Sequence, residues 1–268
     1  MKNILLFVHE DVGQEARLQA ALDITRAVDG HLTCLDMIMF PPLAGSDVWG
    51  TAGASMVVAE ERAIETSNRI RLEKRLAIEG VQWTWINAID DVPTQLERTA
   101  VLNELIVLNR HIEGFAFPDM RAIASDAIVR SGKPVLAVPE IVTGFAATDS
   151  VLIAWDGSRQ ADAALQAALP LLKLASEVTL LEVDSGSVNV PAEDAASLLS
   201  RHGIHANIIR ISKSARRVAD VLLEQISERK PAYVVMGGFG HSRLGEALFG
   251  GVTRVLLTKS PVPLLLAH

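Results

Sequence analysis

Short runs of apolar and β-branched residues alternate along the chain with longer segments whose apolar positions recur at the period of a helix. In the first half, the short runs predict strands at 3–8, 32–38, 81–86, 104–108 and 134–138. Between them, amphipathic segments predict helices at 13–28, 56–78, 93–99 and 120–130. Strand and helix in regular alternation predict an α/β fold, in which a parallel sheet carries helices on both faces.

The second half repeats this order. Strands are expected at 151–155, 178–183, 205–211, 232–236 and 261–266, and helices at 158–175, 191–202, 216–228 and from 252 onward. Leu18–Leu22 recurs as Leu165–Leu169, and the same offset places Ile4–Val8 over Val151–Trp155. A tandem duplication explains these repeats. We therefore expect two tandem, doubly wound, parallel five-stranded sheets, in domains 1–140 and 150–268 joined by a linker at 141–149.

The first half is longer because of an insertion at 40–80, after its second strand. Pro, Gly and Ser residues at 40–50 indicate a long loop, and 56–78 indicates a long, charged, amphipathic helix that covers the sheet. The role of this insertion stays open at this point. One alternative is that the loop and the helix present a surface to a protein partner.

Composition narrows the class of protein. Hydrophobic residues make up 49% of the chain and the mean hydropathy is +0.27, as expected where parallel strands are buried on both faces. No apolar run approaches the roughly 18 residues of a membrane span, and the N-terminal strand turns acidic at Glu10, too early for a signal peptide. The single cysteine, Cys34, excludes an intrachain disulfide and fits a reducing cytoplasm. A net charge of −7 argues against nucleic-acid binding, which needs a basic face.

Glycine turns near the C-terminal end carry the strongest signal for a binding site. Tyr233–Met236 has the composition of a buried strand and breaks into Gly237–Gly240, while Gly250 and Gly251 precede the helix expected from Val252. Backbone N–H groups at a helix start are unpaired, and the helix dipole favours an anion there. Strand, glycine turn and helix start together predict a phosphate cradle. A glycine turn taken alone indicates only a tight turn.

The spacing Gly237-x2-Gly240-x9-Gly250 resembles the ATP loop of the universal stress protein (UspA) family, Gly-x2-Gly-x9-Gly-Ser/Thr. The resemblance extends to the closing strand at 261–266 and to the opening strand at 151–155 with its Asp-Gly-Ser turn. It implies a Rossmann-like fold similar to that of the adenine nucleotide alpha hydrolases. Gly251 departs from the pattern, because nucleotide-binding members carry Ser or Thr there and use its hydroxyl.

This resemblance also implies a nucleotide site on the second half. Asp156 would contact the nucleoside, and the backbone of Val183 would contact adenine. The phosphates would lie among the residues of the glycine turns and the helix start: Gly237, Gly240, Gly250, Gly251, Val252 and Thr253. Met236, before the first turn, and His241, after it, complete the candidate set.

Local structure offers a second explanation for several of these residues. Asp156 is a turn former and Ser158 a good helix N-cap, so this turn needs no ligand to account for it. The Thr253 hydroxyl can partly substitute for the one missing at Gly251, or Thr253 can serve only as a residue in the first turn of a helix. Both explanations stay open.

The first half lacks the nucleotide pattern. His9 stands where the second half has Asp156, followed by Glu10 and Asp11 instead of Gly and Ser, and 109–114 has no glycine cradle. We therefore expect a degenerate UspA-like domain whose last strand meets the last strand of the second half, as in family dimers, so that one chain is a pseudo-dimer. The histidines show no spacing typical of metal ligands, and we expect no metal site.

These patterns predict a cytoplasmic universal stress protein, a regulatory protein of the stress response that binds ATP, with Mg²⁺, or another adenine nucleotide in its second half. No nucleophile elbow or P-loop occurs, so we expect no catalytic residues and no enzyme activity. An interaction protein that binds no nucleotide, and a slow ATPase, are the alternatives. We expect an unidentified protein partner and no nucleic acid or membrane partner, and a homodimer stays open.

Overall fold

The structure, a computed structural model, describes residues 1–38, 51–89, 92–110, 120–184, 190–212, 216–238 and 251–268. The loop expected at 40–50 and most of the glycine turns therefore lie outside the described residues.

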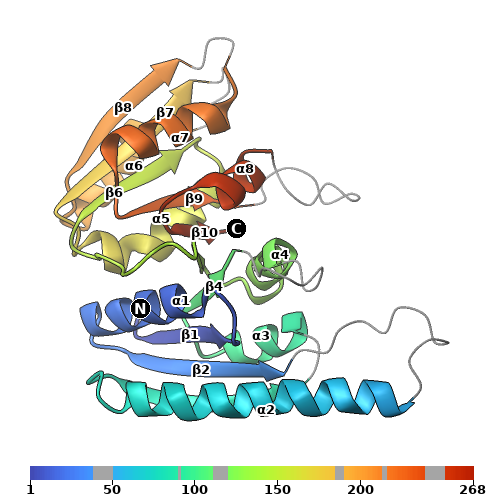
Figure 1. Cartoon of the computed structure of the whole chain (residues 1–268). Coiled ribbons are helices and arrows are strands. Elements are labelled where there is room, and N and C mark those ends of the chain that lie inside the picture. Colours follow the sequence, from blue (N-terminus) through green and yellow to red (C-terminus); the bar gives the residue numbers. More distant parts are fainter. Residues whose placement is uncertain (39–50, 90–91, 111–119, 185–189, 213–215, 239–250) are drawn as a thin grey trace.

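A single mixed sheet runs through the whole molecule (Figure 1). Its ten strands lie in the order β3-β2-β1-β4-β5-β10-β9-β6-β7-β8. Their bounds are β1 Asn3–Val8, β2 His31–Ile38, β3 Gln82–Ile89, β4 Leu105–Asn109, β5 Val135–Val138, β6 Ser150–Trp155, β7 Glu177–Asp184, β8 Ala206–Ser212, β9 Tyr233–Gly237 and β10 Leu264–Ala267. Within each half every described pairing is parallel, and each half has the same doubly wound strand order. The predicted fold class is confirmed.

The helices fall where the periodicity predicts them. Their bounds are α1 Gln14–Ala27, α2 Thr51–Leu76, α3 Val92–Ala100, α4 Met120–Ser131, α5 Arg159–Leu172, α6 Ala192–Arg201, α7 Val218–Arg229 and α8 Gly251–Lys259. Two boundaries differ from the prediction by more than two residues at the start of an element. Helix α2 begins before the expected 56, because Ala residues around Gly53 keep the segment helical. Strand β10 begins at Leu264 instead of 261, because Pro261 and Pro263 have no N–H to donate to a neighbouring strand.

Alternating side chains of the strands point into two hydrophobic cores, one on each face of the sheet. Ile4 and Leu6 of β1 belong to the core under α1, α5 and α6. Leu5 and Phe7 of the same strand belong to the core under α3, α4, α7 and α8. Both faces are therefore covered by helices, which explains the high hydrophobic content of the chain.

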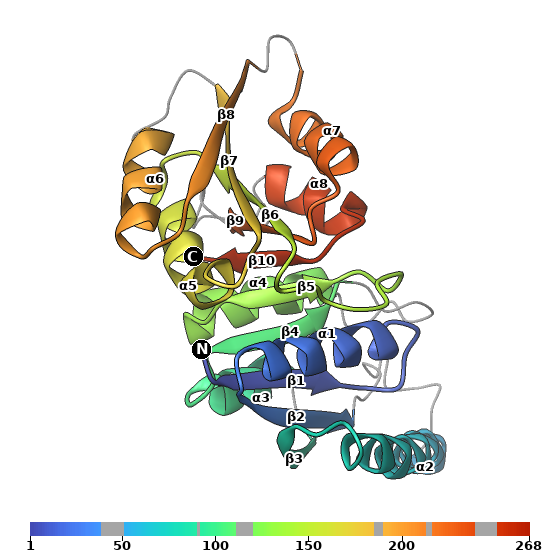
Figure 2. The same cartoon turned by 90° about the vertical axis from the view of Figure 1, so that its left-hand side faces the viewer.

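The two halves join through their last strands, at the centre of the sheet (Figure 2). β5 and β10 pair antiparallel, with Leu136 opposite Leu265. The predicted meeting of the last strands is confirmed, and it converts two five-stranded sheets into one continuous sheet. Among the described helices, none is long and apolar enough to cross a membrane.

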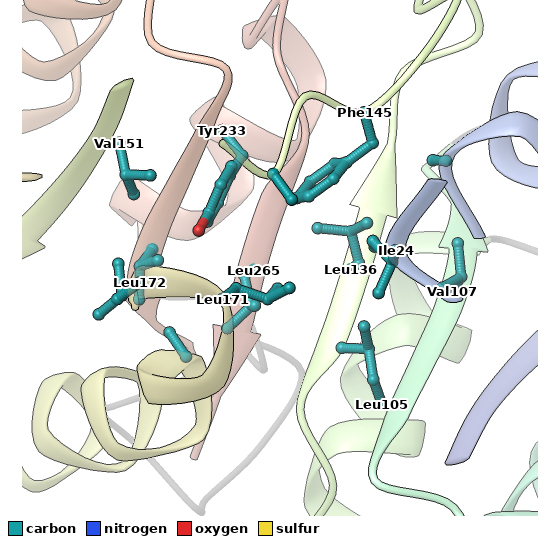
Figure 3. Close-up of a cluster of buried hydrophobic side chains, with 14 of the residues drawn as sticks. Ile24, Leu105, Val107, Leu136, Phe145, Val151, Leu171, Leu172, Tyr233 and Leu265 are labelled. Atoms are coloured by element: carbon teal, nitrogen blue, oxygen red, sulfur yellow. The ribbon is translucent and has the colours of Figure 1, made fainter. Parts of the chain in front are cut away.

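The segment between the halves packs into this junction (Figure 3). Phe145 is buried, its ring centroid lies 4.8 Å from that of Tyr233, and its N–H donates to Asp23 Oδ2 at 2.9 Å. Asp23 belongs to α1 and Tyr233 to β9, so one residue of the expected linker ties an element of each half. Contacts of Phe145 with both halves therefore hold this segment in place.

Candidate functional site

The winding of the second half reverses between β6 and β9, which lie side by side in parallel. In such sheets, ligands bind beyond the carboxyl ends of the strands at this point. Asp156 follows β6, Gly237 ends β9, and β7 flanks β6 on its other side. The structure thus brings to one edge the turns that the sequence places at three separate strand ends.

A cleft of about 300 Å³ opens at this edge. Seven of the ten candidate residues from the sequence line it: Asp156, Val183, Met236, Gly237, Gly251, Val252 and Thr253. The other three, Gly240, His241 and Gly250, lie outside the described residues.

The turn at Asp156 has the local structure that the sequence predicts. Gly157 takes a positive φ of 69°, which favours glycine. Asp156 Oδ1 accepts from the Ser158 N–H at 3.0 Å, and Ser158 Oγ accepts from the Ala161 N–H at 3.1 Å, which caps α5. The turn is therefore built by its own hydrogen bonds, while Asp156 remains exposed at the cleft.

The apolar wall of the cleft includes residues that the sequence did not single out. Val218 and Leu222 of α7 face it together with Leu181 of β7. Trp155 also lines it, held by a hydrogen bond from Nε1 to the Val190 carbonyl at 2.8 Å. Apolar residues four apart on a helix are typical of core packing, so the sequence holds no signal that separates these two from the core.

The two described glycines of the cleft have different surroundings. A Cβ on Gly237 would lie 2.6 Å from the Ala161 nitrogen and 2.7 Å from the Gln160 carbonyl carbon, because the first turn of α5 packs directly on this strand end. A Cβ on Gly251 would meet no described atom within 4 Å. Close packing therefore explains Gly237, whereas packing does not account for Gly251.

The first turn of α8 reaches the cleft with Gly251, Val252 and Thr253. N–H groups of a first helical turn have no partner inside the helix, and they attract an anion. Thr253 is buried in this turn and lines the cleft. The cleft thus combines an apolar wall, one exposed carboxylate and a helix N-terminus, a set suited to a ligand with an apolar ring, hydroxyl groups and an anionic end.

The corresponding edge of the first half is filled by an internal ion pair. Arg17 is fully buried and donates from Nε to the Phe7 carbonyl at 2.8 Å and from Nη2 to the His9 carbonyl at 2.7 Å. Its guanidinium also pairs with Asp11 at 2.7 Å. The buried Arg17 therefore stabilises the turn after β1. At the corresponding position of the second half, Asp156 is exposed at the cleft.

Helix α2 adds acidic side chains to that edge. Glu65 lies with its Oε1 2.7 Å from His9 Nδ1. Burial would raise the pKa of Glu65, but His9, the Glu10 N–H and Asn68 together bring it below its ordinary value. Burial, with a further effect of Glu65, raises the pKa of Asp36 to about 7. No spacing in the sequence connects these groups, because α2 belongs to the insertion and its contacts are set only by folding.

Comparisons with known proteins bear on this fold and site. Residues 192–268 match the model of the universal stress protein family. This part of the chain is therefore similar in sequence to the universal stress protein family. The match covers α6 to β10 and so includes α7, β9 and α8 of the cleft. The sequence matches no curated protein.

Solved structures extend the likeness to the whole chain. A universal stress protein from Archaeoglobus fulgidus DSM 4304 is 17% identical with a TM-score of 0.76, and the alignment covers 100% of this chain and 99% of that one. A functionally unknown protein from Pseudomonas aeruginosa PAO1 is 15% identical with a TM-score of 0.61, over 100% of this chain and 92% of that one. At these identities the likeness concerns the fold. Both halves of the chain therefore lie within one tandem architecture shared with a universal stress protein.

Proposed function

We propose that the chain is a regulatory protein that binds an adenine nucleotide, ATP being the first to test, in the cleft of its second half. The observation that carries the proposal is the lining of that cleft. An apolar wall, the exposed Asp156 and the first turn of α8 meet at the point where the sheet reverses its winding. The similarity of residues 192–268 to the universal stress protein family, together with the glycine spacing at 237–250, supports the proposal.

Each part of the nucleotide has residues suited to it. The adenine ring would lie against Val183 and Met236, and the ribose hydroxyls would donate to Asp156. The phosphates would lie at the first turn of α8, with Gly240, His241 and Gly250 contributing from the glycine turns. No described atom lies within 4 Å of a Cβ built on Gly251, which fits a phosphate that approaches the backbone closely. The missing hydroxyl would then weaken binding without blocking it.

Titration of ATP and Mg²⁺ into nucleotide-stripped protein, followed by calorimetry and by Trp155 fluorescence, tests the proposal. We expect binding at one site per chain. Asp156→Asn removes a charge-assisted hydrogen bond and should weaken it by about tenfold or more. Asp149→Asn is the matched control, because Asp149 is exposed and precedes β6, at the opposite end of the strand from the cleft.

A pair of changes at Gly251 separates the hydroxyl from the added bulk. Gly251→Ser supplies the hydroxyl and should tighten ATP binding several-fold, since a new hydrogen bond contributes about 1 kcal/mol. Gly251→Ala adds the Cβ without the hydroxyl and should bind as the original chain does. If none of these proteins takes up ATP, AMP or cyclic AMP, the nucleotide proposal fails and an interaction protein is the remaining alternative.

We also propose that the protein binds without fast turnover. The cleft lining among the described residues holds Asp156 as its only carboxylate and no histidine, so no general base faces an acidic metal cluster there. Phosphate release from ATP should therefore not exceed that of the Asp156→Asn variant. A release rate that falls with nucleotide affinity across the variants would instead identify a slow ATPase.

A further inference from the structure

We propose that His9, Glu61 and Glu65 form a binding site for a divalent transition-metal cation, such as Zn²⁺, in the first half of the chain. His9 follows β1, at the edge that corresponds to the cleft of the second half, and the two glutamates lie on α2. Figure 1 shows α2 lying along β2, which brings the insertion to this edge. The site is separate from the proposed nucleotide cleft.

The three side chains converge closely enough to share one ion. His9 Nδ1 lies 2.7 Å from Glu65 Oε1 and 3.9 Å from Glu61 Oε1. One ligand atom from each residue lies within 4.8 Å of the others. A tetrahedral cation with bonds of about 2.0–2.2 Å to imidazole and carboxylate holds its ligand atoms about 3.4 Å apart, between the two separations from His9 Nδ1. Small side-chain adjustments suffice to receive it.

Two buried polar atoms at this position have no hydrogen-bond partner among the described residues. His9 is 5% exposed, and its Nδ1 contacts Glu65 Oε1 at 2.7 Å as an ion pair that lacks hydrogen-bond geometry. Asp36 at the end of β2 is also 5% exposed, and its Oδ1 has no partner. Buried polar atoms normally have partners, so a nitrogen and an oxygen left without one beside the same carboxylates point to a missing ligand.

Neighbouring groups hold Glu65 in place. Its Oε1 accepts from the Glu10 N–H at 3.0 Å, and its Oε2 accepts from Asn68 Nδ2 at 3.1 Å. Asn68 is in turn bonded to the Gln14 side chain at 2.8 and 2.9 Å. Outer hydrogen bonds of this kind fix the orientation of metal ligands. Glu61 carries no such bond among those of the described residues and can move toward the ion.

An ion would also balance the local charge. The carboxylates of Asp36, Glu61 and Glu65 gather around a single imidazole. Arg69, which borders a hollow of about 560 Å³ beside Asp36 and Glu65, pairs with Glu73 at 2.8 Å and lies over the Trp85 ring. That hollow gives a path from solvent to Glu65. Imidazole with carboxylates favours Zn²⁺ and similar transition metals over Mg²⁺, which prefers oxygen ligands alone.

The test is a titration of Zn²⁺ into chelator-treated full-length protein without nucleotide, with metal content measured by mass spectrometry and thermal unfolding followed in parallel. We expect one Zn²⁺ per chain and a higher melting temperature with Zn²⁺. Glu61 makes no hydrogen bond to another described side chain, so Glu61→Gln should change little besides the metal ligand. It should weaken Zn²⁺ binding by about 100-fold or more, since loss of a residue that only orients a ligand already costs about 10- to 100-fold. His9→Gln and Glu65→Gln should have the same effect or a larger one.

Glu60→Gln is the matched control, because Glu60 is exposed on the same helix next to Glu61. It should bind Zn²⁺ as the original chain does. Three results would overturn the proposal: metal-free protein that Zn²⁺ does not stabilise, Glu61→Gln that binds as tightly as the control, or Glu60→Gln that loses the metal equally. In the first case His9 and Glu65 form only a structural ion pair.

Discussion

A few buried polar side chains affect the stability of this protein, and Tyr233 is the clearest case. Its side chain is fully buried at the junction of the halves, and its hydroxyl makes no hydrogen bond to the residues that the structure describes. Burial raises its pKa above the ordinary 10.0. The Cys34 thiol is similarly enclosed in β2, where burial, with a further effect of Asp36, raises its pKa to about 12. Both groups stay neutral in the folded protein at physiological pH.

Replacement of Tyr233 by Phe should stabilise the protein. The ring that packs on Phe145 is kept, and an unsatisfied hydroxyl that costs about 1 kcal/mol or more is removed. Above pH 10 the tyrosine ionises in the unfolded chain before it does so in the folded one, so the original protein loses stability as pH rises and the variant does not lose this contribution. Urea unfolding at neutral pH and above pH 10 checks both effects. A variant less stable than the original at neutral pH would mean that the hydroxyl has a partner.

Pairs of elements meet at distances that decide which residue types are allowed. The N-terminus of α5 packs on the end of β9 so closely that only glycine fits at Gly237. The α8 N-terminus borders the same cleft, and no described atom lies within 4 Å of a Cβ built on Gly251. One motif of the sequence thus contains a glycine required by packing and another that packing leaves free.

Gly237→Ala should therefore destabilise the fold, by about 1–3 kcal/mol, as is typical when a side chain is forced into a packed site. The methyl group would meet backbone atoms of Gln160 and Ala161, which cannot move without shifting α5. Urea unfolding measures the loss, with Gly251→Ala as the control that should change stability by less than about 0.5 kcal/mol. Equal loss in both variants would show that the glycine spacing, and not the packing of α5, sets stability.

One continuous sheet runs through both halves of the molecule, and the two halves share a hydrophobic core at its centre. β5 and β10 pair directly, and Figure 3 shows Phe145 between Tyr233 of the second half and Leu136 of the first. Each last strand covers the edge of the other, which removes two open sheet edges. The halves should consequently unfold together.

Phe145→Ala tests this coupling. Loss of the buried ring should lower the stability of the whole chain by about 3–5 kcal/mol, as large-to-small changes in cores do. Trp83 and Trp85 report on the first half and Trp155 on the second. Fluorescence of a Trp155→Phe variant follows the first half, and its difference from the original chain follows the second. Both signals should shift together in urea. Ile141→Ala, at a position 65% exposed in the same segment, is the control and should have little effect. Separate transitions in the original chain would contradict a single cooperative unit.

The sequence by itself determined the elements, their order and the duplication. Apolar periodicity depends on neighbours in the chain, so strands and helices could be placed within a few residues for β1, α1 or α7. The spacing from Gly237 to Gly250 is likewise local, and with the strand ends it locates the edge where the cleft lies. The Asp156 turn is built by hydrogen bonds within four residues, which explains why its geometry was predictable.

Only the tertiary structure decided the features that depend on contacts between distant segments of the chain. The reason for Gly237 lies in α5, and the wall formed by Val218 and Leu222 exists because α7 packs beside β7. His9 and Glu65 are far apart in the sequence and become neighbours only when α2 folds along β2, so no spacing could have suggested the proposed metal site. A site formed by one stretch of the chain can be predicted from the sequence, whereas a site formed by residues from several elements of the sheet requires the tertiary structure.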